Sequence, residues 1–294
     1  MKRVFRIGLV IIVTIICIMV GMRTRQNNGI EVTQFEPQLT RSMGYMIETK
    51  NGKIVMIDGG LPEDNFHVED TLLAKGGEVE AWFITHAHDD HYGALVELIK
   101  SGKVKINNIY VSFNSEEWYQ EYDAERFESI KSMLDLLDSE GIRDKVHELN
   151  LREELTIDNL FFKILKVKNP EYTENAGNNQ SVVIKVSNNI KSMMFLGDLG
   201  SEYEEEFLQN NLDEIKADAV QMAHHGQAGV SDKIYNAINP KICFWPTPDW
   251  LWNNDPGDGS SNGPWKTLET RSWIEKIGAT NYVAKDGNIT INIY

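Results

Sequence analysis

Residues 85–93 read Thr-His-Ala-His-Asp-Asp-His-Tyr-Gly and concentrate side chains that bind metals. Three of the chain's seven histidines and two carboxylates lie within six positions, directly after the apolar run 79–84. If that run is a strand, His86 and His88 project from the same side, because side chains alternate along a strand. These two histidines can therefore hold one cation.

A turn directly after these histidines would bring Asp90 and His91 to a second cation, as in two-metal hydrolytic sites. The alternative is a solvated, histidine-rich loop without a ligand role. Four potential ligands at this spacing behind a buried type of strand favour the metal site.

The pattern of His86, His88, Asp90 and His91 resembles the signature of the metallo-β-lactamase superfamily, His-x-His-x-Asp-His. The resemblance extends from about residue 30 to residue 294, and it implies an α/β fold, a four-layer αββα sandwich. Three further markers follow in the order that the family uses: Ile57-Asp58-Gly59-Gly60, Phe195-Leu196-Gly197-Asp198 and Met222-Ala223-His224-His225-Gly226.

The resemblance implies a role for each marker. Asp58 would orient the ligand loop, since such outer partners fix the direction and basicity of a metal-binding side chain. Asp198 would bridge two metal ions. One histidine of the pair would complete the second metal site; spacing leaves both open, and we favour His225 because it directly precedes Gly226. His224 would then contact the substrate phosphate or support a ligand.

Many members of this family carry one more histidine between the signature and the bridging aspartate. Here the only histidine in that interval is His147, which lies in strand-like sequence and is interpreted as structural. The expected position falls near residues 177–181, Gly-Asn-Asn-Gln-Ser, where Asn179 is predicted to be an outer partner of the site. This pattern is similar to the hydrolase domain of competence-type DNA-uptake proteins and to phosphorylcholine esterases. In that branch the first metal keeps an open coordination position, as a catalytic metal needs.

The predicted cofactor is a pair of Zn²⁺ ions, with other divalent metals as an alternative, and Asp90 and His224 are the predicted catalytic residues. Two zinc ions bridged by Asp198 would activate water at neutral pH for attack on phosphorus or on a carbonyl carbon. His88 stands where the di-iron branch of the family carries glutamate. The site is therefore rich in nitrogen, which favours zinc and hydrolysis over oxygen chemistry.

The sequence predicts an N-terminal membrane anchor or signal segment over residues 1–28, followed by one hydrolase domain over residues 29–294. Three basic residues precede the run 7–22, which carries no charge. No small-x-small cleavage pattern follows, and this favours an uncleaved anchor. Basic residues before such a run keep the N-terminus inside the cell. The expected location is extracytoplasmic, membrane-anchored, or secreted if the segment is removed.

The formal net charge of −15 argues against nucleic acid as a partner, because nucleic-acid binding depends on Lys and Arg that neutralise phosphates. For an exported enzyme this favours a small-molecule or cell-envelope phosphoester, for example a phosphorylcholine-type group. Four of the seven tryptophans cluster after the last predicted ligand, and Trp245, Trp250 and Trp252 are predicted to form a substrate wall. Packing within the sandwich is the alternative for these rings.

We therefore expect a metal-dependent hydrolase that acts on phosphoesters or phosphodiesters outside the cytoplasm. Two alternatives remain open. The same site could hydrolyse carbon esters, lactones or amides, or the chain could be a binding module that keeps the fold without turnover. The missing third histidine gives a reason for the second alternative.

The elements that must position these residues alternate between strands and helices, which predicts two β-sheets with helices outside. Asn51-Gly52 is a hairpin signal between two early strands. Helices are predicted over residues 92–100, 115–139, 202–210, 232–238 and 266–277. Strands are predicted over residues 31–35, 42–49, 53–58, 79–84, 106–112, 145–149, 160–167, 182–186, 217–222, 241–245, 280–284 and 288–293.

Overall fold

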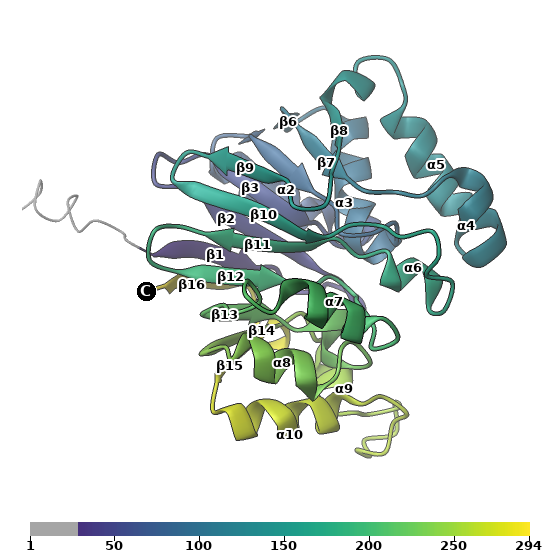
Figure 1. Cartoon of the computed structure of the whole chain (residues 1–294). Helices are drawn as coiled ribbons and strands as arrows, with labels where there is room; N and C mark the ends of the chain where they lie inside the picture. The colour runs from purple at the N-terminus through teal and green to yellow at the C-terminus, as the bar shows by residue number, and fades with distance from the viewer. Residues whose placement is uncertain (1–28) are drawn as a thin grey trace, which may run out of the picture.

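The computed structural model describes residues 29–294 (Figure 1), so the predicted N-terminal anchor or signal segment lies outside the described residues. In residues 29–294, no helix is both long and apolar enough to cross a membrane. This part of the chain folds into two seven-stranded sheets that face each other, with helices on both outer sides.

The first sheet is built mainly from the N-terminal half of the chain. At its centre, two strands pair antiparallel around the predicted hairpin turn, in which Gly52 has a φ of 83°. The strands on one side of this hairpin run parallel to each other. In order across the sheet, the strands are β16 (Ile289–Ile293), β1 (Ile30–Gln34), β2 (Gly44–Glu48), β3 (Ile54–Asp58), β5 (Ala81–Phe83), β7 (Ile109–Val111) and β8 (Val146–Glu148).

The second sheet is built from the C-terminal half of the chain. Half of it is antiparallel and half is parallel, and each parallel connection crosses over through a helix. In order across the sheet, the strands are β15 (Thr280–Val283), β14 (Ile242–Trp245), β13 (Ala219–Gln221), β12 (Ser192–Phe195), β11 (Val183–Ser187), β10 (Leu160–Lys166) and β9 (Glu154–Ile157).

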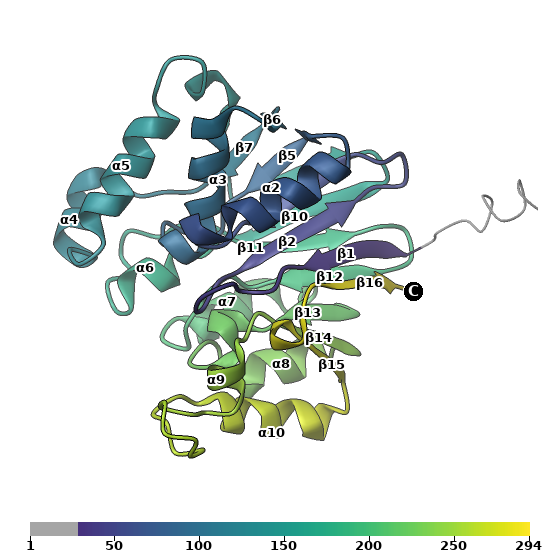
Figure 2. The ribbon, with the colours of Figure 1, turned by 180° about the vertical axis from the view of Figure 1, so that it is seen from behind.

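Three apolar cores hold the layers together. Between the sheets the rings of Phe83 and Phe162 are fully buried and stack with their centroids 5.1 Å apart. A second core lies under the helices of the first sheet, and a third under those of the second sheet (Figure 2). The predicted four-layer αββα sandwich is therefore confirmed. The first group of helices is α2 (Asn65–Ala74), α3 (Asp89–Ser101), α4 (Glu116–Tyr122) and α5 (Phe127–Leu137), and the second is α7 (Glu204–Asn211), α8 (Asp232–Ile238) and α10 (Thr267–Ile277).

The prediction of one long helix over residues 115–139 is wrong. The structure has α4 and α5 in this region, with a break at Asp123. Asp123 has a φ of −139° and a ψ of 45°, outside the helical region, and its buried carboxylate lies against His88. A contact between residues far apart in the sequence therefore accompanies the break, which helical periodicity does not reveal.

Other elements also differ from the prediction. The strands expected over residues 79–84 and 106–112 are each divided, because β4 (Glu78–Val79) and β6 (Lys105–Ile106) pair in a small sheet of their own. Helix α2 and strand β9 were not predicted. None of these differences changes the layer order.

Candidate metal centre

Asp58 ends β3 and organises the loop that follows β5. Its carboxylate accepts hydrogen bonds from the backbone N–H and the hydroxyl of Thr85, both at 2.8 Å, and lies 2.8 Å from Nδ1 of His91. Complete burial raises the pKa of Asp58, although the charge of His91 and these hydrogen bonds oppose the rise. The structure thus places Asp58 where the predicted orienting role requires it.

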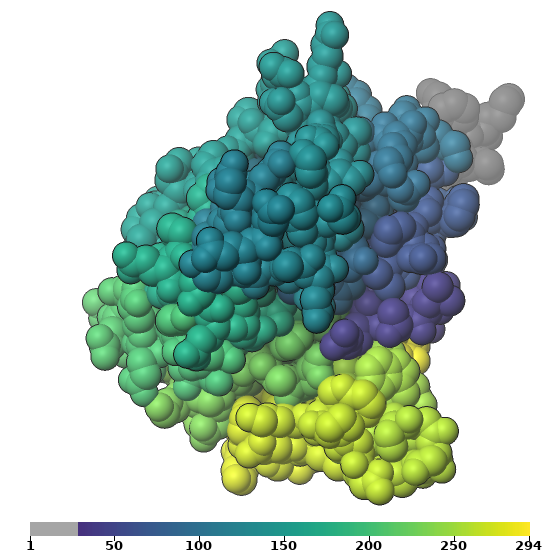
Figure 3. All heavy atoms as spheres, turned by 90° about the vertical axis from the view of Figure 1, so that its right-hand side faces the viewer, coloured from purple at the N-terminus to yellow at the C-terminus, as the bar shows by residue number. Residues whose placement is uncertain are grey.

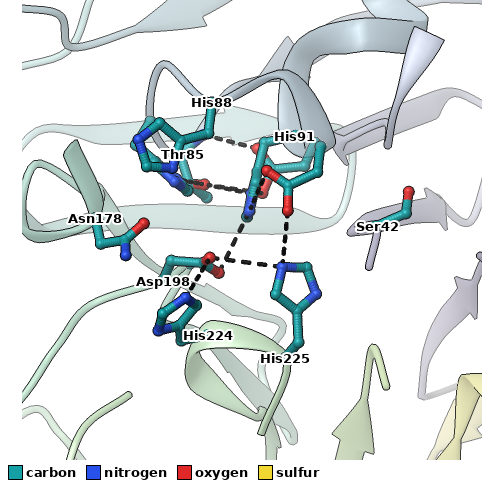
Figure 4. Close-up of polar contacts among 12 residues, drawn as sticks. Ser42, Thr85, His88, His91, Asn178, Asp198, His224 and His225 are labelled. Carbon is teal, nitrogen blue, oxygen red and sulfur yellow. Dashed lines mark hydrogen bonds and ion pairs between the residues drawn. The ribbon is translucent and has the colours of Figure 1, made fainter. Parts of the chain in front are cut away.

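Four side chains from the two sheets converge in one cluster (Figure 4). The ligand atoms of Asp90, His91, Asp198 and His225 all lie within 4.8 Å of one another. Nε2 of His225 lies 3.1 Å from Oδ2 of Asp90 and 3.5 Å from Oδ2 of Asp198. Nε2 of His91 lies 3.3 Å from Oδ1 of Asp198. Two imidazoles and two carboxylates at these separations suit a divalent metal ion.

Buried atoms without partners distinguish this cluster from an ordinary polar core. Nε2 of His91, Oδ1 of Asp198 and Nε2 of the neighbouring His86 are buried and have no hydrogen-bond partner in residues 29–294. An unpaired buried polar atom costs about 1–3 kcal/mol, and a bound metal ion would remove that cost. The donor set therefore fits the predicted divalent metal.

Outer partners decide which ring nitrogen each histidine can offer. Nδ1 of His225 lies 3.1 Å from the carbonyl oxygen of Pro246, and Nδ1 of His86 lies 3.2 Å from the hydroxyl of Thr85. Asp58 holds Nδ1 of the third histidine, as described above. Such contacts fix the tautomer and the orientation of the ring. Nε2 of each ring is left for a ligand.

His86 and His88 lie beside the four-residue cluster. Their ring centroids are 4.5 Å apart, and the ring of His86 lies 4.1 Å from that of His91. Burial lowers the pKa of His86 well below its ordinary value, and the charges of His91 and His88 lower it further. The ring therefore stays neutral, which is the form that binds metals.

His88 is oriented by a residue that the sequence analysis missed. Its Nε2 lies 2.9 Å from Oδ2 of Asp123, and both side chains are buried. The other carboxylate oxygen of Asp123 accepts a hydrogen bond from Arg126 at 3.3 Å. A Cβ at Gly177 would lie 2.2 Å from Nε2 of His88 and 2.3 Å from Oδ2 of Asp123. The contact between these two side chains therefore requires glycine at position 177. The pairing leaves Nδ1 of His88 for a metal.

We expect Asp123→Asn to weaken metal binding roughly 10- to 100-fold, the range for loss of such an outer partner. The neutral amide keeps the size of the side chain but holds the imidazole of His88 less firmly. Competition with a chromogenic chelator measures the affinity, and Asp135→Asn, at an exposed position of α5, is the matched control. Equal affinities in both variants would show that Asp123 does not orient a ligand.

The position expected for a third histidine is occupied by α6 (Ala176–Asn179). Asn178 lines the cavity over the cluster together with Asp198 (Figure 4), and its buried Oδ1 has no partner within the described part of the chain. His147 lies in β8, where its Nε2 pairs with Asn108 at 3.0 Å, and it does not line the cavity. This position agrees with the structural interpretation of His147.

Three buried polar side chains hold the turn that carries Asp198. Oγ of Ser181 accepts the N–H of Asp198 at 2.9 Å, and Oδ1 of Asn179 accepts the N–H of Gly200 at 3.0 Å. Oε1 of Gln221 accepts the two N–H groups that precede Asp198 in the chain, at 2.7 and 2.9 Å. Asn179, predicted as an outer partner, thus acts on the backbone of the turn. Ser181 and Gln221 were not predicted as site residues.

Residues 224–226 form a left-handed turn. His224 and His225 have φ angles of 49° and 55°, and Gly226 has a φ of 77°. This conformation is rare for residues other than glycine and costs about 1–3 kcal/mol each. The turn directs His225 into the cluster, whereas His224 lines the cavity with Nε2 3.8 Å from Oδ2 of Asp198. The geometry therefore favours His225 as the ligand.

The three predicted wall tryptophans lie outside the cavity lining. Trp245 is fully buried, and its ring packs against Gly226, where an added Cβ would come within 2.4 Å of the ring. The ring of Trp250 lies 4.8 Å from that of Trp265, and Trp252 stacks against an arginine at 4.1 Å. The structure thus places these rings in packing contacts, the alternative to a substrate wall.

A cavity of about 490 Å³ opens over the cluster. Asp90, Asp198 and His224 line it, and two cations, Arg41 and Arg126, contribute to its wall. In the space-filling view of this side (Figure 3), the purple N-terminal segment lies close to the teal region of α4 and α5 and to the green and yellow second half of the chain. The cavity thus combines potential metal ligands with groups that can bind a polar substrate.

Comparison with known proteins agrees with this fold and cluster. The family model described as the metallo-beta-lactamase superfamily matches residues 40–238. The chain belongs to this superfamily. The resemblance predicted from the signature is confirmed, and the superfamily together with the His/Asp cluster makes the chain a metal-dependent hydrolase.

One curated relative and two solved structures are similar to this chain. ComE operon protein 3 of Bacillus subtilis (strain 168) is 30% identical over 175 residues, or 59% of this chain and 20% of that protein. The chain thus spans about a fifth of this relative's length. Igni18, a metallo hydrolase from Ignicoccus hospitalis KIN4/I, is 14% identical with a TM-score of 0.54 over 90% of this chain and 100% of that one. CmlA, a diiron beta-hydroxylase from Streptomyces venezuelae, is 12% identical with a TM-score of 0.58 over 90% of this chain and 54% of that one. At these identities the two structures show the shared fold.

Proposed function

We propose that the chain is a dinuclear zinc hydrolase of phosphoesters or phosphodiesters that acts outside the cytoplasm. The observation that supports this chemistry most is the cluster of Asp90, His91, Asp198 and His225 beneath a cavity of about 490 Å³. When bound there, a divalent metal supplies a Lewis acid and activates water at neutral pH.

The arrangement of histidines supports two metal ions rather than one. His91 and His225 belong to the cluster, and His86 and His88 lie next to it, each with one ring nitrogen left free by its outer partner. Oδ1 of Asp198 makes no hydrogen bond among the described residues, and its ion-pair contact is with Nε2 of His91 at 3.3 Å. Four imidazoles in one centre suit zinc. The diiron enzyme CmlA shares the fold, so metal analysis must separate zinc from iron.

Asp90 and His224 are proposed to act on the substrate side of the centre. Burial raises the pKa of Asp90, but the charge of His91 and the contact with His225 outweigh it and hold the pKa well below its ordinary value. Asp90 therefore stays ionised where it lines the cavity. His224 lines the same cavity, where its imidazole can contact a substrate oxygen.

The charges of the cavity support an anionic substrate of small size. Arg41 and Arg126 line it beside the carboxylates of Asp89, Asp90, Asp123 and Asp198, and the chain as a whole carries a formal net charge of −15. Guanidinium groups bind phosphoryl oxygens strongly. The same negative net charge disfavours long polyanions. We therefore propose a small-molecule or cell-envelope phosphoester, and no nucleic acid, as the partner.

We also propose that the N-terminal segment attaches the enzyme to a membrane. Residues 7–22 carry no charge and follow three basic residues. Cell fractionation of the full chain should recover it with membranes, with the hydrolase domain open to protease added from outside. Recovery of a shortened chain in the medium would indicate cleavage and secretion instead.

Metal removal and reconstitution test the proposed activity on the full-length protein. We expect the chelated protein to be inactive and the reloaded protein to hold two zinc ions per chain and to hydrolyse bis-p-nitrophenyl phosphate. Parallel samples receive Fe²⁺ or Mn²⁺, and p-nitrophenyl acetate and a lactone serve as neutral substrates. Turnover of the neutral substrates alone would contradict the phosphoester proposal. Stoichiometric metal without any turnover would identify a binding module.

A further inference from the structure

Arg41 differs from the other arginines that the structure describes. The side chains of the other four, Arg126, Arg143, Arg152 and Arg271, each contact an acidic group, an amide or an aromatic ring. Within residues 29–294, Arg41 alone among the arginines has no hydrogen bond, ion pair or ring contact. It is half-buried and lines the cavity. Up to five N–H donors of its guanidinium are thus unused.

The loop that carries Arg41 is held firmly on its outer side. Asp64, which is buried, accepts the N–H groups of Gln38 at 2.9 Å and Leu61 at 2.8 Å, and the hydroxyl of Ser42 also donates to it. These contacts anchor the loop just before and just after Arg41. Its backbone is therefore ordered before any substrate binds.

The same loop is also attached to the ligand loop of the metal centre. The N–H of Met43 donates to the carbonyl oxygen of Asp90 at 2.9 Å. Arg41 lies only two residues before this contact, so its backbone position is set relative to a potential metal ligand. Such pre-organisation reduces the conformational entropy that binding must overcome.

Four carboxylates line the cavity, those of Asp89, Asp90, Asp123 and Asp198, and within the described residues Arg41 forms an ion pair with none of them. Asp123 is engaged by His88 and Arg126, and Asp90 belongs to the metal cluster. Arg41 lines the cavity together with Asp198 and His224. Arg41 therefore lines the same cavity as the predicted metal ligands Asp90 and Asp198.

We propose that Arg41 recognises the substrate's negative charge, with its guanidinium donating hydrogen bonds to non-bridging oxygens of a phosphoryl group. The inference rests on the proposed hydrolase function and adds the residue that would bind the phosphoryl group of its substrate. A planar guanidinium forms paired hydrogen bonds with phosphoryl oxygens, and an ammonium group does not reproduce that geometry. A neutral ester offers this group no charge to bind.

The test compares zinc-loaded, full-length Arg41→Gln and Arg41→Lys with the wild type and with Arg143→Gln, a matched control at an exposed arginine. Inorganic phosphate is the binding probe, and its affinity is measured by calorimetry after metal content has been checked in each sample. We expect Arg41→Gln to weaken phosphate binding roughly 10- to 100-fold, the range for a lost hydrogen bond to a charged group. The phosphate affinity of Arg41→Lys is expected to lie between those of Arg41→Gln and the wild type. The affinity of Arg143→Gln is expected to equal that of the wild type.

The kinetic arm uses bis-p-nitrophenyl phosphate and p-nitrophenyl acetate. For each variant, kcat/KM for the diester is divided by kcat/KM for the neutral ester. Arg41→Gln is expected to lower this ratio by a factor similar to the loss of phosphate affinity, mainly because KM for the diester rises. An unchanged ratio, or phosphate affinity equal to that of the wild type at equal metal content, would overturn the role of Arg41. So would a wild type that does not bind phosphate. If the wild type hydrolyses neither ester, the proposed function fails, while the phosphate titrations still decide on Arg41.

Discussion

Replacement of Asp198 with alanine is expected to remove both hydrolysis and most of the metal from the chain. Asp198 is the residue that both halves of the centre share, because its oxygens lie 3.3 Å from Nε2 of His91 and 3.5 Å from Nε2 of His225. Metal chemistry of this kind contributes several kcal/mol to the transition state. Its loss corresponds to a rate reduction of roughly 10³-fold or more.

Metal per chain, measured by elemental analysis, and the initial rate on a phosphodiester check this expectation. The turn itself should survive, since Ser181 binds the backbone N–H of residue 198 rather than its side chain. Asp213→Ala, at an exposed position outside the cavity, is the matched control. An Asp198→Ala protein that kept its metals and a tenth of its activity would contradict the assignment.

The second large effect separates the two adjacent histidines. His225→Ala is expected to lose one metal equivalent and to lower the rate by more than the roughly 100-fold that loss of an outer partner causes. The reason is that Nε2 of His225 belongs to the four-residue cluster. His224→Ala is expected to keep its metal and to lose roughly 10- to 100-fold in kcat/KM, the range for a hydrogen bond to a charged group.

Metal analysis and steady-state kinetics on both variants make this comparison, and each variant serves as the control for the other. Both substitutions place alanine at a left-handed position of the same turn, so effects on backbone strain are matched between them. Metal loss in His224→Ala together with retention in His225→Ala would reverse the assignment.

The ligand cluster was predictable because each of its residues lies in a short pattern that can be recognised in the sequence. His86 to His91 form a dense signature, and Asp198 and His225 each follow an apolar strand at a turn. Strand ends of the two sheets meet at one edge, so residues at these turns converge. Order along the chain and strand periodicity were sufficient for this part of the site.

The residues that surround the cluster were not predictable in the same way. Asp123 lies within an apparently continuous helical pattern, and only its contact with His88, 35 residues earlier, sets it apart. Arg41 precedes the signature by many residues and approaches it through one backbone hydrogen bond, from Met43 to Asp90. Neither contact leaves a periodic trace in the sequence.

The tryptophans illustrate the opposite difficulty. Their density near the last histidine suggested a binding wall, but strand position decides which way a side chain points. Trp245 lies in β14 and supports the turn of Gly226 from beneath, and Trp250 packs on another ring. The sequence shows where aromatic residues are dense, but their contacts in the folded chain determine whether they pack in the sandwich or bind a substrate.

The cluster draws its members from opposite halves of the sandwich. Asp90 and His91 follow β5 of the first sheet, whereas Asp198 and His225 follow β12 and β13 of the second. A cation bound by all four would cross-link the two sheets at this edge. Metal binding and the association of the two sheets are then thermodynamically linked. Any change that increases the affinity for the ion also opposes separation of the sheets.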